Sequence, residues 1–169
     1  GQPWPGQERL RLGGVPRMSL AAGLSSQIEE RLRAVLPAEV AVVHARDLAG
    51  AIESSQRVPA VQIYDGGFRV EELTNDRIAC RLEWSWICVC AVRKPKAQVD
   101  SFESREAAYL LGDQVIAALL GWKPPTTVHT RFRMATPPRP QWSKGGFGYL
   151  PLVFTTQLTV RGEPQRTGV

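Results

Sequence analysis

The sequence RIACRLEWSWICVCAV, residues 77–92, has the alternating pattern of a single long β-strand. Apolar or bulky side chains occupy every second position from 80 to 92, so they share one face of the strand. The opposite face begins with charged and polar residues and ends with apolar ones, including Ile87 and Val89. We therefore expect the first face to lie in the core throughout. The end of the second face is expected to be covered by a helix of the same chain or by another subunit.

A second segment with strand character, FGYLPLVFTTQLTV, lies near the end of the chain at residues 147–160. Its side chains alternate in the same way, and its length matches that of the first strand. The two segments are therefore expected to pair in one sheet. Neither carries catalytic groups, so function is expected at the edges of this scaffold and in what it assembles into.

Two main helices are indicated by apolar residues spaced three or four positions apart, at residues 20–36 and 101–120. Ser19 is the expected N-cap of the first helix, and Asp100 with Glu103 makes a capping box for the second. Each helix has one apolar face, which is expected to pack on the sheet.

Shorter apolar runs predict further strands around these elements. The sequence Asp65-Gly66-Gly67 between two of them has the composition of a hairpin turn, because glycine adopts positive φ without strain. The predicted fold class is α+β: a single domain with a mostly antiparallel twisted sheet of four to six strands and two main helices packed on it. The further strands are expected at residues 40–44, 58–64, 68–73 and 128–134, with a turn of helix or a loop at 47–54.

The chain has 169 residues, 43% of them hydrophobic, which suits one domain with a sizeable core. Residues 1–17 are rich in proline, glycine and arginine and follow neither period, so they predict an extended N-terminal arm. The folded domain is expected at 18–162, followed by a C-terminal tail at 163–169. Neither a membrane span nor a signal peptide is predicted. The start at Gly1 fits removal of an initiator methionine, with Met18 as the alternative start.

The formal net charge of +5 and the pI near 9.5 permit contact with nucleic acid or an acidic protein, but such values are also common on ordinary soluble proteins. The distribution of charge is more informative, because no acidic residue lies between Asp113 and Glu163. The last third of the chain is therefore expected to present a cationic surface. Its basic residues in that interval are Lys123, Arg131, Arg133, Arg139, Lys144 and Arg161.

The three cysteines, Cys80, Cys88 and Cys90, occupy alternate positions of the long strand and are expected to face the core. Their odd number and their clustering argue against a disulfide framework and favour a reducing, cytosolic setting. A zinc site at Cys88 and Cys90 is disfavoured, because residues two apart on a strand are separated by roughly 6.6 Å, whereas sulfurs on one zinc lie within about 4 Å. Buried structural thiols are the better interpretation.

Nucleophilic catalysis needs a serine or cysteine beside a histidine that a carboxylate orients. Neither His44 nor His129 has a recognisable catalytic context in the sequence. The GGFG sequence at residues 145–148 is followed by a strand, so it predicts a hairpin turn and not a phosphate-binding loop. We therefore assign no catalytic residue, no metal site and no cofactor, and we expect that the chain is not an enzyme.

The proline-rich segment at residues 136–146 is the strongest candidate for recognition of a partner. Trp142, flanked by Arg139 and Lys144, could anchor in a partner surface, or it could fold back onto the domain. Two arginines that alternate on the preceding strand could face DNA phosphates or solvent. The candidate interface residues are therefore Arg139, Trp142, Lys144, Arg131 and Arg133, together with Ile87 and Val89 of the long strand.

The order of these elements resembles that of the tail terminator, or tail completion, proteins of long-tailed bacteriophages, with the Mu-like branch as the most similar. The resemblance rests on the first helix, the sequence PAVQIYDGG, the long strand RLEWSWICVCAVRKP, the helix EAAYLLGDQVIAALLGWKP and the closing strand GYLPLVFTTQLTVRG. It covers residues 19–162 as a pattern, without the N-terminal arm or the loop at 136–146.

The resemblance implies an α+β protomer that forms a homo-oligomeric ring, a hexamer, at the head-proximal end of the tail in the virion. Such a ring caps the tail tube, stops its polymerisation and joins it to the head–tail connector. The implied partners are the tail tube protein and the connector protein. Genome DNA passes through the lumen without specific binding, and assembly takes place in the cytoplasm of the bacterial host.

Two other functions are compatible with the residues. The first is a basic nucleic-acid-binding module of a phage or mobile element, which would use the arginines and Trp142. The second is an enzyme with Cys88 or Cys90 as the nucleophile, which would require a reactive thiol.

Overall fold

The computed structural model describes residues 11–12, 15–16, 19–53, 57–94, 102–125, 129–143 and 145–163. The predictions for the N-terminal arm at residues 1–10, for Asp100, for Lys144 and for the tail at 164–169 lie outside the described residues. In chain order the described elements are β1 (Arg11–Leu12), β2 (Val15–Pro16), α1 (Leu20–Val35), β3 (Ala41–His44), α2 (Leu48–Glu53), β4 (Ala60–Leu73), β5 (Ala79–Arg93), α3 (Phe102–Leu119), β6 (Arg133–Ala135), β7 (Gln141–Trp142) and β8 (Phe147–Arg161).

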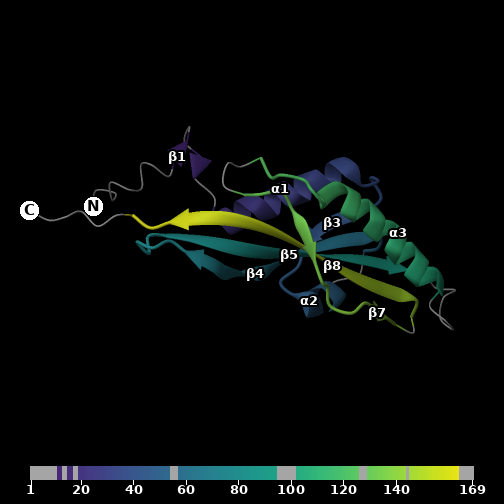
Figure 1. Ribbon diagram of the computed structural model, residues 1–169. Helices are drawn as coiled ribbons and strands as arrows, with labels where there is room; N and C mark the ends of the chain where they lie inside the picture. The colour runs from purple at the N-terminus through teal and green to yellow at the C-terminus, as the bar shows by residue number, and fades with distance from the viewer. Residues whose placement is uncertain are drawn as a thin grey trace, which may run out of the picture.

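A mixed sheet of six strands forms the centre of the molecule (Figure 1). The strand order is β3-β4-β5-β8-β6, and the short β7 pairs with β8 farther along the same strand. β3 runs parallel to β4, while the other neighbouring strands are antiparallel. β1 and β2 form a separate two-stranded ladder. The predicted fold class, a single α+β domain, is confirmed.

The two long strands β5 and β8 are central neighbours, as their matching lengths predict. Each has 15 residues, and their antiparallel register is unbroken from Ala79 opposite Arg161 to Arg93 opposite Phe147. This continuous pairing gives every side chain of β5 a fixed face, because successive side chains of a strand point to opposite sides of the sheet.

The main core lies between one face of the sheet and the helices α1 and α3. Trp86, Cys88 and Cys90 of β5 contribute to it, so the prediction that the buried cysteines face the core is confirmed. The helices contribute buried aliphatic side chains at the predicted helical spacing, such as Ile28 of α1 and Val115 of α3. None of the described helices is long and apolar enough to cross a membrane.

A smaller core lies on the opposite face of the sheet, under α2. Ile87 and Val89 of β5 pack there with Ala51 of α2, and Val89 has no exposed surface. The segment at 47–54, predicted as a turn of helix or a loop, is thus a short helix that covers this face. Of the two covers considered for the end of the long strand, the structure shows a helix of the same chain.

The prediction of a hairpin turn at Asp65-Gly66-Gly67 is wrong, because β4 continues through these residues as one strand. Asp65 pairs with Trp86 and Phe68 pairs with Trp84, so the two glycines form a bulge in the β4–β5 ladder. Gly67 has a φ of 82°, and a Cβ atom on Gly66 would lie 2.3 Å from Cδ1 of Ile87. The turn that connects β4 to β5 instead falls at residues 74–78.

The side chain of Asp65 holds this bulge in place. Its Oδ1 atom accepts hydrogen bonds from the backbone N–H of Gly67 at 2.7 Å and from the indole Nε1 of Trp84 at 2.6 Å. The glycines therefore serve a local kink, and the apolar alternation resumes at Phe68, whose ring lies 5.3 Å from that of Trp84.

The far edge of β8 is covered by an interrupted strand. His129 forms an isolated bridge with Leu158, β6 pairs at residues 133–135, and β7 pairs at 141–142. The strand predicted at 128–134 is therefore shorter and shifted, and part of the predicted loop at 136–146 is strand. Pro137, Pro138 and Pro140 lie between β6 and β7, where they interrupt the pairing because proline cannot donate to a ladder.

The edge strand β3 is tied to α1 by a chain of side-chain contacts. The ring of His44 is hydrogen-bonded to Oγ of Ser25 at 3.0 Å through Nδ1 and to Oε2 of Glu29 at 2.7 Å through Nε2. Arg33 bridges Oε1 of Glu29 at 2.8 Å and the carbonyl of Val42 at 3.0 Å. The hydrogen bond from His44, followed by that from Arg33, holds the pKa of Glu29 below its usual value.

The bulge makes a prediction about Asp65. Replacing Asp65 with Ala removes the acceptor of two hydrogen bonds and leaves the largely buried indole N–H of Trp84 without it. We expect a loss of about 1–3 kcal/mol in the free energy of unfolding, measured by urea denaturation. The matched control Asp65→Asn keeps an acceptor oxygen and should lose less. Equal losses in the two variants would show that the hydrogen bonds do not hold the bulge.

The lowered pKa of Glu29 predicts a pH-dependent contribution to stability. Its ionised form is favoured in the folded chain, so the contribution is present above the unfolded pKa of about 4.3 and is lost as pH falls through the lower folded value. At pH 5, Glu29→Gln should therefore reduce the free energy of unfolding by about 0.5–1 kcal/mol. Below that pH the difference in the free energy of unfolding between the wild type and the variant should shrink. A gap that is the same at pH 5 and pH 3 would contradict the linkage.

Candidate interaction surfaces

The predicted recognition loop is tied to the edge of the sheet through β7. Trp142 is half-buried, and its ring lies over Gly148, where a Cβ atom would come within 2.7 Å of it. The same ring lies 6.3 Å from the ring of Tyr109 on α3. The indole therefore folds back onto the domain, which was one of the two possibilities, and only part of it remains available to a partner.

The predicted basic residues do different things in the structure. Arg131 donates a hydrogen bond from Nη1 to the carbonyl of Gly121 at 2.9 Å, just beyond the end of α3. Hydrogen bonds with Glu71 and then Arg69 hold the pKa of Glu83 below its usual value, and the positive charge of Arg133 in β6 makes the smallest contribution to that shift. Arg139 is exposed between the prolines of the loop. Two of the arginines thus interact with their own chain, and Arg139 is the basic residue best placed for a partner.

Ile87 and Val89 are poor interface candidates once α2 is in place. Their side chains are buried in the smaller core, so neither offers surface to another subunit. The apolar character of this half of the strand is explained by the six-residue helix above it. The interface role predicted for these two residues is therefore corrected to a role in the core.

The buried thiols have an environment that disfavours reactivity. Burial raises the pKa of Cys88 to about 12, and burial together with the neighbouring Cys88 raises that of Cys90 well above its ordinary value. A thiol nucleophile reacts as the thiolate and needs the opposite shift. Within the described part of the chain, no group of three or more histidine, cysteine, aspartate or glutamate side chains could hold a metal ion.

Ser25, His44 and Glu29 have the connectivity of a catalytic triad, which sequence reasoning missed because Ser25 and Glu29 lie on α1 whereas His44 lies on β3. Their surroundings do not support acyl transfer. Ser25 lies within α1, where backbone N–H groups donate to carbonyls one turn earlier. The neighbouring backbone therefore offers no donors for an oxyanion. We interpret the three residues as the tie between β3 and α1.

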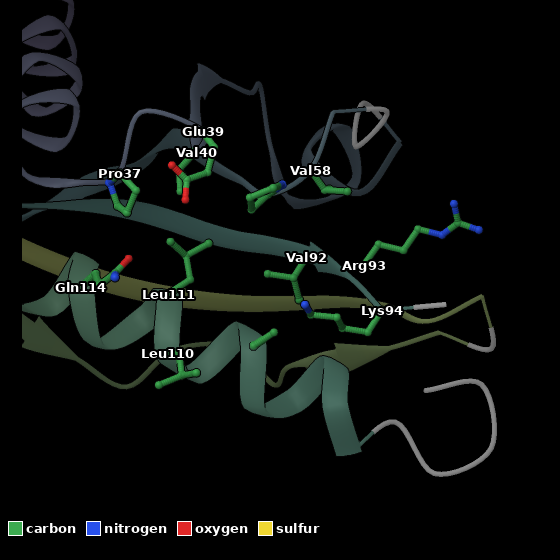
Figure 2. Close-up of a pocket in the computed structure, with 12 residues that line it drawn as sticks. Pro37, Glu39, Val40, Val58, Val92, Arg93, Lys94, Leu110, Leu111 and Gln114 are labelled. Carbon is green, nitrogen blue, oxygen red and sulfur yellow. The ribbon is translucent and has the colours of Figure 1, made fainter. Parts of the chain in front are cut away.

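A mainly apolar groove lies beside α3, with a volume of about 290 Å³. Leu111 and Val92 point into it from α3 and β5, while Val40 and Val58 line the opposite side (Figure 2). Leu110 stands at its rim and is 57% exposed. Charged side chains also border the groove, namely Glu39, Arg93 and Lys94.

At the other end of the sheet, β4 and β5 extend beyond the helices together with the end of β8 (Figure 1). We call residues 65–83 the β-arm. Within the described residues, β3 pairs with β4 only from Ala60 to Ile63, so the outer edge of the β-arm has no neighbouring strand. We call its exposed apolar side chains the apolar stripe: Phe68, Val70 and Leu73, which are 56%, 56% and 58% exposed.

The apolar stripe continues the core face of the sheet. Phe68 lies opposite Trp84, and Val70 lies opposite Leu82, both of which belong to the main core. Sequence reasoning placed a strand here but missed the exposure, because the reach of α1 and α3 along the sheet is not encoded in the strand's own pattern. The signal available was the alternation of Phe68 and Val70, which repeats the apolar core pattern in a segment with no helix predicted beside it.

A family model described as "Phage tail terminator protein" matches residues 18–166. No curated protein matches the sequence. Among solved structures, a chain of the virion of a native gene transfer agent particle is similar in fold, with a TM-score of 0.52 and 12% sequence identity. That alignment covers 83% of this chain and 98% of the other.

The structural likeness at this low identity shows the fold alone, whereas the family match spans nearly the whole chain. It begins just before α1 and ends beyond β8, so it includes both cores and both ends of the sheet. The chain therefore belongs to the phage tail terminator family and is a phage structural protein.

Proposed function

We propose that the chain acts as the terminator of a phage tail, with six copies forming a ring on the head-proximal end of the tail tube. The ring stops polymerisation of the tube and presents a surface to the head–tail connector. The observation that carries this proposal is the family match over residues 18–166. The similarity in fold to a chain of a virion supports a place in an assembled particle.

The partners in this proposal are further copies of the chain, the tail tube protein and the connector protein. Genome DNA passes through the lumen without specific binding, and assembly takes place in the cytoplasm of the bacterial host. An arm at residues 1–17, a body at 18–162 and a tail at 163–169 complete the proposed organisation. Placement in the Mu-like branch stays a prediction.

The physical form of the protomer supports a ring. Ring contacts join two different faces of identical subunits, and this protomer has apolar surface at two ends of its sheet. The exposed Arg139 lies near the β8 side of the sheet, at the opposite end of the strand order from β3. We assign this edge to a protein partner and not to DNA, because a lumen through which DNA must move benefits from weak contacts.

The ring predicts a discrete oligomer. The solution mass of the purified chain, measured by light scattering over a concentration series and at two salt concentrations, should approach six times 18.7 kDa. Tails assembled without the protein should be longer than normal, and added protein should restore their length. Tails of normal length in its absence would refute the terminator role, whatever the mass in solution.

Arg139 is expected to contribute to joining. Because its side chain is exposed, Arg139→Ala should leave the stability and ring mass unchanged. It should reduce the yield of joined particles several-fold when heads and completed tails are mixed. The matched control is Arg46→Ala, since Arg46 is 91% exposed on the opposite side of the sheet order, between β3 and α2. Equal yields from both variants would remove Arg139 from the interface.

A further inference from the structure

The protomer has two exposed apolar features, and they lie at opposite ends of the sheet. The apolar stripe belongs to the β-arm, and the groove lies beside α3 at the other end (Figures 1 and 2). Both are on the face of the sheet that carries α1 and α3, because the apolar stripe pairs with main-core residues and the groove is lined by Leu111 of the same core.

We propose that the apolar stripe of one copy docks into the α3 groove of the next copy and that this contact closes the ring. The inference rests on the proposed function, which requires a ring, and adds which surfaces form it. A second copy is the fitting occupant because one chain supplies both a protruding apolar side and a concave apolar one. Such a head-to-tail contact leaves each docked copy with one free feature for the next neighbour, so the copies form a ring when the rotation between neighbours closes.

The shapes of the two features fit this arrangement. Phe68 is the largest side chain of the apolar stripe and is 56% exposed. The groove has a volume of about 290 Å³, and its walls are supplied largely by aliphatic side chains and two prolines. Leu110 projects at the rim, where an incoming strand would cover it. An aromatic anchor seated in an apolar pocket is the usual centre of a strong interface.

The charges around the two features also complement one another. The β-arm carries five acidic side chains against three basic ones. Arg69 contacts both Glu71 and Glu83, and Arg81 contacts Glu72, so the arginines are shared among carboxylates of the arm itself. The groove is bordered by Arg93 and Lys94 against the single acid Glu39. An arm with excess negative charge therefore meets a rim with excess positive charge, which favours this orientation of docking.

Two aspartate variants test the contact. Phe68→Asp alters only the apolar stripe and Leu110→Asp alters only the groove, and both side chains are more than half exposed, so the protomer should still fold. Each variant should associate at least about 30-fold more weakly than the wild type, as expected for a central interface residue. The matched control is Val43→Asp, which places the same change on β3 at a valine that is 39% exposed and outside both features. The control should keep the mass of the ring.

Mixing the two variants gives a sharper test. Phe68→Asp keeps an intact groove and Leu110→Asp keeps an intact stripe, so one competent contact can form between them. The mixture should therefore yield a one-to-one dimer and no ring, seen by native mass spectrometry, while each variant alone stays monomeric. A self-complementary interface would not give this result.

The outcomes separate this inference from the proposed function. Rings of unchanged mass from both aspartate variants would overturn the docking but not the ring. The partner of the apolar stripe would then be residues 1–17 or another tail protein. A wild-type chain that stays monomeric at every concentration would also overturn the docking as a self-association surface. In that case the length of assembled tails would still decide the terminator role independently.

Discussion

The pairing of β5 with β8 is the constraint on which the rest of the structure depends. Its register is unbroken over 15 residues, so it decides which side of the sheet each side chain occupies. Trp86, Cys88 and Cys90 thereby face α1 and α3, while Ile87 and Val89 face α2. A slip of one residue would exchange these two sets and would place large apolar side chains under a helix too short to cover them. Both cores therefore specify the same register.

The elements that sequence reasoning predicted well are those whose pattern is long and local. The alternation of β5 and β8 and the helical spacing of α1 and α3 each extend over more than a dozen residues. The prediction of a hairpin turn at Asp65 was wrong for a different reason. Asp-Gly-Gly is compatible with a turn or a bulge, and the choice depends on a hydrogen bond to Trp84, which is 19 residues away. A contact between residues so far apart in the chain cannot be predicted from the local sequence pattern.

The interaction surface was harder to predict from the sequence, because the exposure of a residue depends on which other elements cover it. Ile87 and Val89 have the composition of a shared interface, yet six residues of α2 bury them. Trp142 has the setting of a recognition residue, yet Gly148 leaves room for its ring against the domain. Among the candidate residues that the structure describes, Arg131, Arg133 and Arg139 are exposed, and Arg139 is the one that lies in the predicted loop. Exposed and buried positions were thus distinguished by tertiary packing and not by residue type.

The same argument explains why the β-arm is the unusual part of this protomer. The core face of the sheet remains mainly apolar into the β-arm, but α1 and α3 cover only part of it. Phe68, Val70 and Leu73 therefore keep more than half of their surface exposed. Apolar area left in water forgoes roughly 25 cal/mol per Å² relative to burial, and an uncovered strand edge invites pairing with other chains. A monomer gains nothing from such a feature, whereas a subunit of a ring gains the contact that holds it to its neighbour. In the ring proposed above, the β-arm is therefore core that is completed by assembly.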